Sequence, residues 1–302
     1  MHKVKDNKSI LITGGSGFIG KAVKEALIDL SYDVCTIGRS KKEDICLDLN
    51  SEKLSDVIKQ FLPNIVCHFA SGSSVTRAEE KKEEEEKDTV LATKHLLDVL
   101  LSVNPNTKLL YLSSQAVYGL PTYLPVDEKH PLKPINFYGR NKLKAEELII
   151  KSSLDYLIMR VSSVFGEKQD YKKSGVIVKF VNKLKSNKSP VVFNNIDLIC
   201  DFIYVYDLVS AIVKIIELEY FPKEIVNLGS GQQTTLQDVL NILYKYFPHA
   251  PEPVIEKSEL YTNENNKGIY LDISKIKNSI DWNIQYNVEK GLKHMLGNLS
   301  HV

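Results

Sequence analysis

The chain carries close to its N-terminus the segment SILITGGSGFIG, residues 9–20. A short apolar run, SILIT, is followed by three regularly spaced glycines and then by an amphipathic stretch that extends to Leu30. A strand, a tight turn and a helix in this order let the backbone approach a pyrophosphate and direct the helix N-terminus at it. Because this pattern opens an alternating series of strands and helices, it predicts a phosphate-binding turn made of Gly14, Gly17, Phe18, Ile19 and Gly20.

The first 160 or so residues alternate apolar runs with helical patterns. Strands are expected at 9–13, 33–37, 64–69, 107–112 and 156–161, and helices at 18–30, 51–61, 87–101 and 143–150. Near-continuous apolar strands that alternate with helices are typical of a parallel sheet covered on both faces. The predicted fold class is therefore α/β, a doubly wound parallel (Rossmann) sheet whose ligands lie beyond the carboxyl ends of the strands.

The pattern loosens after about residue 164. Short strands are expected at 190–193, 202–205 and 225–228, between helices near 176–184, 207–217 and 235–247. We expect a dinucleotide-binding domain at 1–165 and a smaller α/β substrate lobe at 166–302, with one segment returning to the first domain near 200–230. The charged run EEKKEEEEK at 79–87 predicts a solvated helix face.

The composition argues against several classes of protein. A formal net charge of +1 is unlike the basic excess of a nucleic-acid-binding protein. No stretch approaches the ~20 apolar residues of a membrane span, and the N-terminus lacks the apolar region of a signal peptide. The four cysteines show no metal-binding spacing and suit a reducing compartment. We therefore expect a cytoplasmic protein with no metal site and no membrane or nucleic-acid partner.

The end of the second expected strand bears on which dinucleotide binds. A carboxylate roughly 20 residues past the glycines typically accepts a hydrogen bond from the ribose 2′-hydroxyl of NAD. Gly38 stands at that position and is followed by Arg39 and Ser40, a cation and a hydroxyl that suit a 2′-phosphate. The sequence therefore favours NADP(H). NAD is the alternative, since Arg39 stacked on the adenine would tolerate either cofactor.

Taken together, these features resemble the extended short-chain dehydrogenase/reductase family, which includes nucleotide-sugar epimerases, dehydratases and reductases. The resemblance runs nearly end to end and rests on TGGSGFIG (13–20), CLDLN (46–50), HFAS (68–71), YLSSQAVYG (111–119), YGRNK (138–142), RVSSVFG (160–166), DFIYVYDL (201–208) and VNLGSG (226–231). Besides the glycine turn, Arg39 and Ser40, it implies a dinucleotide site made of Asp48, Leu49, Phe69, Ala70, Ser71, Tyr138, Lys142 and Val161.

The resemblance also implies a catalytic set of Ser114, Tyr138 and Lys142. The pattern YxxxK occurs twice, but only the pair at 138 and 142 opens a helix in the right place. Residues i and i+4 share a helix face, so Lys142 can lie near both Tyr138 and the cofactor ribose. A phenol has an ordinary pKa of about 10, and Lys142 and an oxidised nicotinamide are expected to lower it. The implied reaction is hydride transfer between nicotinamide C4 and a sugar carbon, with Tyr138 moving the matching proton.

Departures from the family pattern narrow the reaction. Dehydratases that resemble this family carry an Asp-Glu pair after the Ser or Thr, whereas this chain has Gln115 and Ala116, so we do not expect a 4,6-dehydratase. Cys200 replaces an Arg that contacts a diphosphate, Ser163 replaces an Asn, and Thr89 replaces another Asn. Substrate contacts are expected from Ser73, Ser114, Gln115, Ser163, Val176, Lys179 and Lys267, with the two lysines as substitutes for the missing Arg.

The sequence supports two reactions at C4 of a nucleotide sugar almost equally. The missing second-strand carboxylate slightly favours a 4-keto sugar-nucleotide reductase, whereas the segment GEKQDYKKSGVI (166–177) resembles 4-epimerases. A reductase of another small carbonyl compound and a catalytically silent dinucleotide-binding sensor are further alternatives. The complete Ser114–Tyr138–Lys142 set argues against the sensor.

Relatives often form dimers through two helices. A homodimer contact through Leu91, His95, Leu143 and Leu148 is one expectation, and burial of these residues within the monomer is the other.

Overall fold

The structure is a computed structural model that describes residues 8–72, 75–170, 175–258 and 267–299. The chain divides into two compact units, each assembled from separate segments. Unit 1 comprises the described residues up to Val117 together with Pro134–Arg160 and Val209–Val226. Unit 2 comprises Tyr118–Lys133, Val161–Leu208 and the described residues from Asn227 onward.

A seven-stranded sheet in the order β11-β6-β5-β4-β1-β2-β3 forms the centre of unit 1. Its strands are β1 (Ser9–Thr13), β2 (Asp33–Gly38), β3 (Ile45–Cys46), β4 (Ile65–His68), β5 (Lys108–Ser114), β6 (Asp155–Val161) and β11 (Glu224–Leu228). The pairings of β1 with β2 and β4, of β2 with β3 and of β4 with β5 are parallel. The strand order reverses beside β1, which is where doubly wound sheets bind their ligands. The predicted doubly wound parallel sheet is confirmed.

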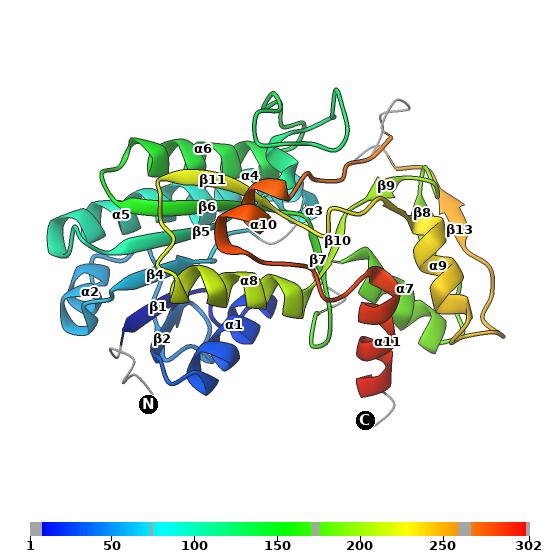
Figure 1. Ribbon diagram of the computed structural model, residues 1–302, viewed down its shortest axis with the longest axis horizontal. Coiled ribbons are helices and arrows are strands. Elements are labelled where there is room, and N and C mark those ends of the chain that lie inside the picture. The colour runs from blue at the N-terminus through cyan, green and yellow to red at the C-terminus, as the bar shows by residue number, and fades with distance from the viewer. Residues whose placement is uncertain (1–7, 73–74, 171–174, 259–266, 300–302) are drawn as a thin grey trace. The chain divides into compact units, whose positions relative to one another are not determined.

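Helices cover both faces of this sheet (Figure 1). On one face lie α1 (Phe18–Asp29) and α8 (Val205–Glu217), and on the other α5 (Ala92–Val103) and α6 (Phe137–Lys151). The remaining helical segments of unit 1 are α2 (Leu54–Phe61), α3 (Val75–Glu80), α4 (Lys82–Glu86), the π-helical turn η1 (Lys87–Leu91) and the 3-10 turn η2 (Gln115–Val117). The strands are nearly continuous runs of buried apolar residues, which is why the sheet accepts helices on both sides.

Two differences from the sequence predictions bear on the site. Helical spacing was expected only at 143–150, although the pair at 138 and 142 was expected to open a helix; α6 begins at Phe137, because the side chain of Asn136 caps it by accepting a hydrogen bond from the Gly139 N–H at 2.8 Å. The prediction of a solvated face for residues 79–87 is wrong for Glu85, whose side chain is fully buried.

Unit 2 contains, within its described segments, three two-stranded sheets. They pair β7 (Ser163–Phe165) with β10 (Phe202–Tyr204), β9 (Ile199–Cys200) with β12 (Thr234–Thr235), and β8 (Val191–Phe193) with β13 (Val254–Glu256). Its helices are α7 (Val176–Lys185), α9 (Leu236–Tyr244), α10 (Ser274–Ile280) and α11 (Val288–Leu299). The buried carboxylate of Asp201 joins two loops of this unit, because it accepts hydrogen bonds from the Ser230 N–H at 2.7 Å and the Leu271 N–H at 3.1 Å.

Two kinds of feature are absent from the described ranges. No helix there is long and apolar enough to cross a membrane. No group of three or more His, Cys, Asp or Glu side chains there is arranged to hold a metal ion.

Candidate active site

The glycine-rich turn between β1 and α1 forms a cradle for an anion. Gly14 has a φ of +71°, and a Cβ there would lie 3.0 Å from the backbone of Ala70. Gly20 lets α1 approach the turn, since a Cβ there would lie 2.3 Å from the carbonyl oxygen of Gly14. Gly17 caps α1 without a side-chain hydrogen bond, and the first turn of the helix contains no acidic residue. No acidic residue of the helix's own first turn therefore offsets the positive end of the helix dipole, which fits a dinucleotide pyrophosphate.

Arg39, directly after β2, is already paired with a carboxylate. Its Nη1 and Nη2 atoms donate to Oδ1 and Oδ2 of Asp88 at 2.9 and 2.8 Å. Arg77 also donates to Asp88, at 2.9 Å. The hydroxyl of Ser40 accepts a hydrogen bond from the Lys42 N–H at 3.1 Å. The sequence analysis did not foresee Asp88 as the partner that balances the charge of Arg39.

A second carboxylate lies beside the end of β2, where the sequence shows only Gly38. Glu43 is 8% exposed, and its Oε1 accepts a hydrogen bond from the Ser16 N–H of the glycine turn at 2.8 Å. Its carboxylate packs against two glycines: a Cβ at Gly38 would lie 3.1 Å from Oε1, and one at Gly15 would lie 3.0 Å from Oε2. A carboxylate therefore stands beside the end of β2, although Gly38 occupies the position along the chain where one was expected.

The catalytic set forms where the first turn of α6 packs on η2. Gly139 permits this close approach, because a Cβ there would lie 2.5 Å from the carbonyl oxygen of Ala116. Ser114 ends β5 directly before η2, its hydroxyl accepts a hydrogen bond from the Ala116 N–H at 3.2 Å, and it lies near enough to the Tyr138 phenol to lower the pKa of that phenol. The sequence analysis gave Gly139 no role. The sequence signal for this close contact was a glycine inside a helix. Such a glycine lowers the stability of the helix by about 1 kcal/mol relative to alanine, so a packing contact is expected to require it.

Lys142 lies one turn after Tyr138 on α6 and is 2% exposed. Its ammonium donates to the Ser71 hydroxyl at 2.8 Å and to the carbonyl oxygen of Leu112 at 2.6 Å. The ammonium nitrogen lies 5.9 Å from the centroid of the Tyr138 ring. Burial lowers the pKa of Lys142 to about 8, and the negative charge of Glu85 opposes that shift. Ser71, predicted as a cofactor contact, is thus also a hydrogen-bond partner of the catalytic lysine.

The pKa of Tyr138 moves in the direction opposite to the one expected. Burial raises it to about 12, the hydrogen bond with Ser114 lowers it, and the negative charge of Glu85 raises it further. The sequence analysis expected Lys142 and an oxidised nicotinamide to lower this pKa. Of these two groups only the lysine belongs to the protein, and it does not reverse the effect of burial.

The structure distinguishes Ser114 from its neighbour Ser113. The Ser113 hydroxyl donates to the buried carboxylate of Glu146. The same carboxylate binds the buried Arg160 guanidinium at 2.7 Å. Ser113 therefore belongs to an interior polar network, whereas Ser114 acts on the pKa of Tyr138, the phenol predicted to be catalytic.

Glu85 is an acidic residue near Lys142 that the sequence analysis missed. Its Oε1 accepts a hydrogen bond from the Thr89 hydroxyl at 3.1 Å, and its Oε2 accepts one from Nη1 of Arg77 at 3.1 Å. The carboxylate fills the space beside Gly72, where a Cβ would lie 1.7 Å from either oxygen. Burial raises the pKa of Glu85, while Thr89 and Arg77 lower it. Thr89 lies in the π-helical turn η1, a kind of turn that is frequent at functional sites.

The other residues predicted to contact the dinucleotide follow strands of the central sheet or end one. They are Phe69 and Ala70 after β4, Asp48 and Leu49 after β3, and Val161 at the end of β6. The N–H groups of Phe69 and Ala70 both donate to the Thr13 hydroxyl, at 3.2 and 3.0 Å. Leu49 is buried in the core of unit 1. The contacts of all these residues with a dinucleotide stay predictions.

The predicted substrate contacts are divided between the two units. In unit 1, the buried Oε1 of Gln115 lacks a hydrogen-bond partner among the described residues. The contacts in unit 2 are Ser163 on β7, Val176 and the exposed Lys179 on α7, and the exposed Lys267, whose carbonyl oxygen accepts a hydrogen bond from the Ile199 N–H at 3.1 Å. Ser73 lies outside the described residues. The roles of these residues also stay predictions.

The four residues predicted at a dimer contact differ in their surroundings. Leu91 is 50% exposed. Leu148 packs against the core of unit 1, and the His95 ring is hydrogen-bonded to the carbonyl oxygen of Leu49 at 2.7 Å. Leu143 is partly exposed. The homodimer stays a prediction.

Comparisons with known proteins place this geometry in context. Residues 10–229 match the model of the NAD dependent epimerase/dehydratase family. The chain is 32% identical, over 95% of its length and 97% of the relative's, to a Methanocaldococcus jannaschii protein provisionally named UDP-glucose 4-epimerase. It is 27% identical, over 95% of its length and 96% of the relative's, to the dTDP-4-dehydro-6-deoxyglucose reductase of Escherichia coli. The structure of a Thermotoga maritima UDP-glucose 4-epimerase with UDP-glucose is similar in fold, with a TM-score of 0.89 at 23% identity over 97% of this chain and 99% of that one.

Proposed function

The chain belongs to the NAD-dependent epimerase/dehydratase family, and from that premise we propose that it epimerises C4 of a nucleotide-activated sugar. The observation that carries the proposal is the grouping of three side chains: the Ser114 hydroxyl lowers the pKa of the Tyr138 phenol, and the Lys142 ammonium nitrogen lies 5.9 Å from the centroid of the Tyr138 ring. A phenol in contact with a second hydroxyl and next to a buried cation can exchange a proton with a sugar hydroxyl.

The protein's own groups take distinct parts in this reaction. The glycine turn would hold the pyrophosphate of the dinucleotide, which when bound accepts the hydride from C4 and returns it. Tyr138 takes the proton of the C4 hydroxyl at its phenol oxygen, and Ser114 orients the same sugar oxygen. Lys142 supplies the positive charge that stabilises the phenolate, and its hydrogen bonds to Ser71 and Leu112 fix its position. Gln115 and Ala116 supply no acid or base for the loss of water, which is why elimination is not part of the proposal.

The choice of epimerase over reductase has two supports. The relative that is 32% identical is provisionally named an epimerase. The sequence argument for a reductase rested on a missing carboxylate, and Glu43 supplies a carboxylate at that place. A 4-keto sugar-nucleotide reductase is the second candidate, favoured by the relationship to the E. coli reductase.

Substrate binding by unit 2 is also part of the proposal. Lys179 and Lys267 are exposed cations that can bind the diphosphate of a nucleotide sugar in place of the missing arginine. The sequence leads us to propose a cytoplasmic location and a homodimer.

Incubation of the full chain with UDP-glucose and with a dTDP-4-keto sugar tests the assignment. Inversion at C4 of the first substrate, seen by proton NMR without net consumption of added dinucleotide, supports the epimerase. Stoichiometric oxidation of reduced dinucleotide by the second substrate supports the reductase instead. Tight dinucleotide binding without turnover of either substrate, or of further nucleotide sugars, supports the silent sensor. Tyr138→Phe serves as the inactive control in each assay.

A further inference from the structure

The loop after β2 holds Glu43 in a fixed position. Asp44 accepts hydrogen bonds from both the N–H and the hydroxyl of Thr36, each at 2.9 Å, and its own N–H donates to the same hydroxyl at 3.0 Å. Lys24 of α1 binds the Asp44 carboxylate at 2.9 and 2.8 Å. The Glu43 N–H donates to the carbonyl oxygen of Ser40 at 3.1 Å. These bonds tie the loop to β2 and α1, so the Glu43 side chain reaches the glycine turn.

The Glu43 carboxylate has one oxygen with a partner and one without. Oε1 accepts the Ser16 N–H at 2.8 Å. Oε2 is buried and has no hydrogen-bond partner in the described part of the chain. A buried carboxylate oxygen without a partner is costly, so its position calls for a donor that arrives with a ligand. Beside a glycine turn at the end of the second strand, the donor of suitable chemistry is a ribose hydroxyl.

A 2′-phosphate does not suit this position. It would place a second anion against the Glu43 carboxylate, and the Ser16 N–H is already engaged. Arg39, the cation on which the NADP prediction rested, is held by Asp88 through two hydrogen bonds. Lys41 and Lys42 follow in the loop, but both are exposed, so solvent and salt screen their charges.

We infer that Glu43 accepts a hydrogen bond from the adenosine ribose of the bound dinucleotide and makes the protein selective for NAD(H) over NADP(H). This inference rests on the dinucleotide binding that the proposed function requires. Glu43 lies five positions after Gly38, the position at which the sequence rule expects the carboxylate. The inferred preference is for NAD(H), whereas the sequence favoured NADP(H).

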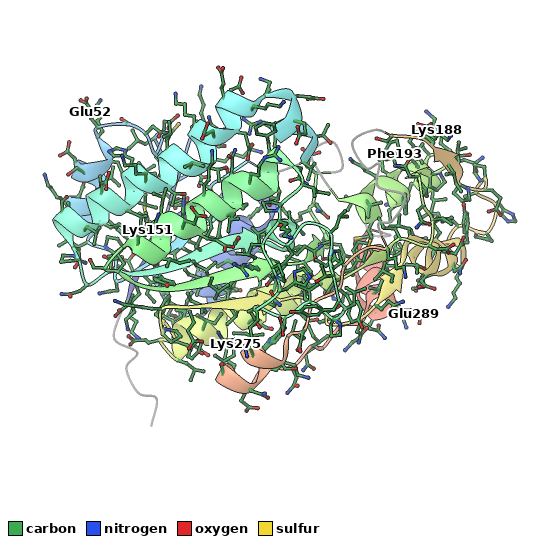
Figure 2. All side chains as sticks on the ribbon, turned by 90° about the horizontal axis from the view of Figure 1, so that it is seen from above. Glu52, Lys151, Lys188, Phe193, Lys275 and Glu289 are labelled. Atoms are coloured by element: carbon green, nitrogen blue, oxygen red, sulfur yellow. The ribbon has the colours of Figure 1, made fainter. Side chains whose placement is uncertain are left out.

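Calorimetric titration of the dinucleotide-free full chain with NAD and with NADP tests the inference without reference to turnover. We expect NAD to bind at least about 100-fold more tightly than NADP, since like charges at a binding interface cost several kcal/mol. Glu43→Gln keeps an oxygen for the Ser16 N–H and removes the charge. We expect it to reduce the ratio of the NADP dissociation constant to the NAD dissociation constant by about tenfold or more. Glu52→Gln is the matched control, because Glu52 is an exposed glutamate just before α2 (Figure 2).

The outcomes separate this inference from the proposed function. A wild-type protein that binds NADP as tightly as NAD, or more tightly, overturns the inference and leaves a dinucleotide-dependent enzyme in place. An NAD preference that persists in Glu43→Gln overturns the role of Glu43. A protein that binds neither dinucleotide overturns both the inference and the proposed function. An NAD preference that Glu43→Gln narrows and Glu52→Gln does not supports the inference. Thermal melting of each variant shows whether it is folded.

Discussion

Replacement of Gly139 by alanine tests whether the contact between α6 and η2 assembles the catalytic set. A Cβ at this position would lie 2.5 Å from the carbonyl oxygen of Ala116, whereas ordinary van der Waals contact begins at 3.4 Å, so the helix has to move by about 0.9 Å. Tyr138 is the preceding residue, and its phenol lies near enough to the Ser114 hydroxyl for Ser114 to lower its pKa. The displacement therefore separates the two catalytic hydroxyls. A misplacement of about 1 Å can cost about 100-fold in rate, which corresponds to about 2.7 kcal/mol in the activation free energy.

The assay is kcat for C4 inversion, measured together with thermal melting. We expect kcat of Gly139→Ala to fall by about 100-fold. Its free energy of unfolding should fall by no more than about 2 kcal/mol, because overpacking costs about 1–3 kcal/mol and the gain in helix propensity offsets about 1 kcal/mol of that cost. Gly297→Ala is the control: it makes the same exchange in α11, where a Cβ meets nothing within 4 Å, so it should keep wild-type kcat. A Gly139→Ala enzyme with wild-type kcat would refute the role of this contact.

Three further predictions concern the charges at the site. Tyr138→Phe should lower kcat for C4 inversion by about 10²–10⁴-fold; a small loss of kcat would mean that another group moves the proton. Lys142→Met should raise the melting temperature at pH 7. The folded-state pKa of the lysine is about 8 against an ordinary 10.5, so its charge destabilises the fold by about 3 kcal/mol below pH 8. That cost disappears as the pH rises from 8 to 10.5, so the gain in the melting temperature of Lys142→Met over wild type should shrink by pH 10. A melting temperature of Lys142→Met below that of wild type at pH 7 would contradict a destabilising charge on Lys142. Glu85→Gln should move the acidic limb of the kcat–pH profile to lower pH, because Glu85 raises the pKa of Tyr138. Glu86→Gln, on the same helix but exposed and paired with Lys144 at 2.7 Å, should not move the limb, and an unmoved limb in Glu85→Gln would remove Glu85 from the site.

The fold was predictable because its signals are local. The strand expected at 9–13 is β1, and the helix expected to start at Phe18 does start there, since the apolar run and the helical spacing on either side of the glycines are local signals. The pair Tyr138 and Lys142 was also predictable, because four residues on a helix fix their shared face. In each case the structure follows from residues that are close together in the chain.

The missed residues depend on packing between distant segments. Gly139 matters because the chain at residue 116 comes within contact distance of it. Glu85 lies in a run of exposed charges, and only the approach of Gly72 and Thr89 shows that this one carboxylate is buried. A charge pattern along the chain cannot distinguish Glu85 from Glu84 or Glu86, since the difference arises from the turn of η1 against the segment after β4.

Glu43 shows how a sequence rule that inspects one position can miss a carboxylate at this site. The rule inspects one position along the chain, whereas the requirement is a carboxylate at one place in space. In this chain Asp44 folds the loop back onto β2, and Glu43 supplies the carboxylate from five positions later than Gly38. A Cβ at Gly38 would lie 3.1 Å from Oε1 of Glu43, so an aspartate at 38 would bring two carboxylates into the same space. Gly38 and Glu43 therefore depend on each other, because the absence of a side chain at Gly38 leaves the space that the Glu43 carboxylate occupies.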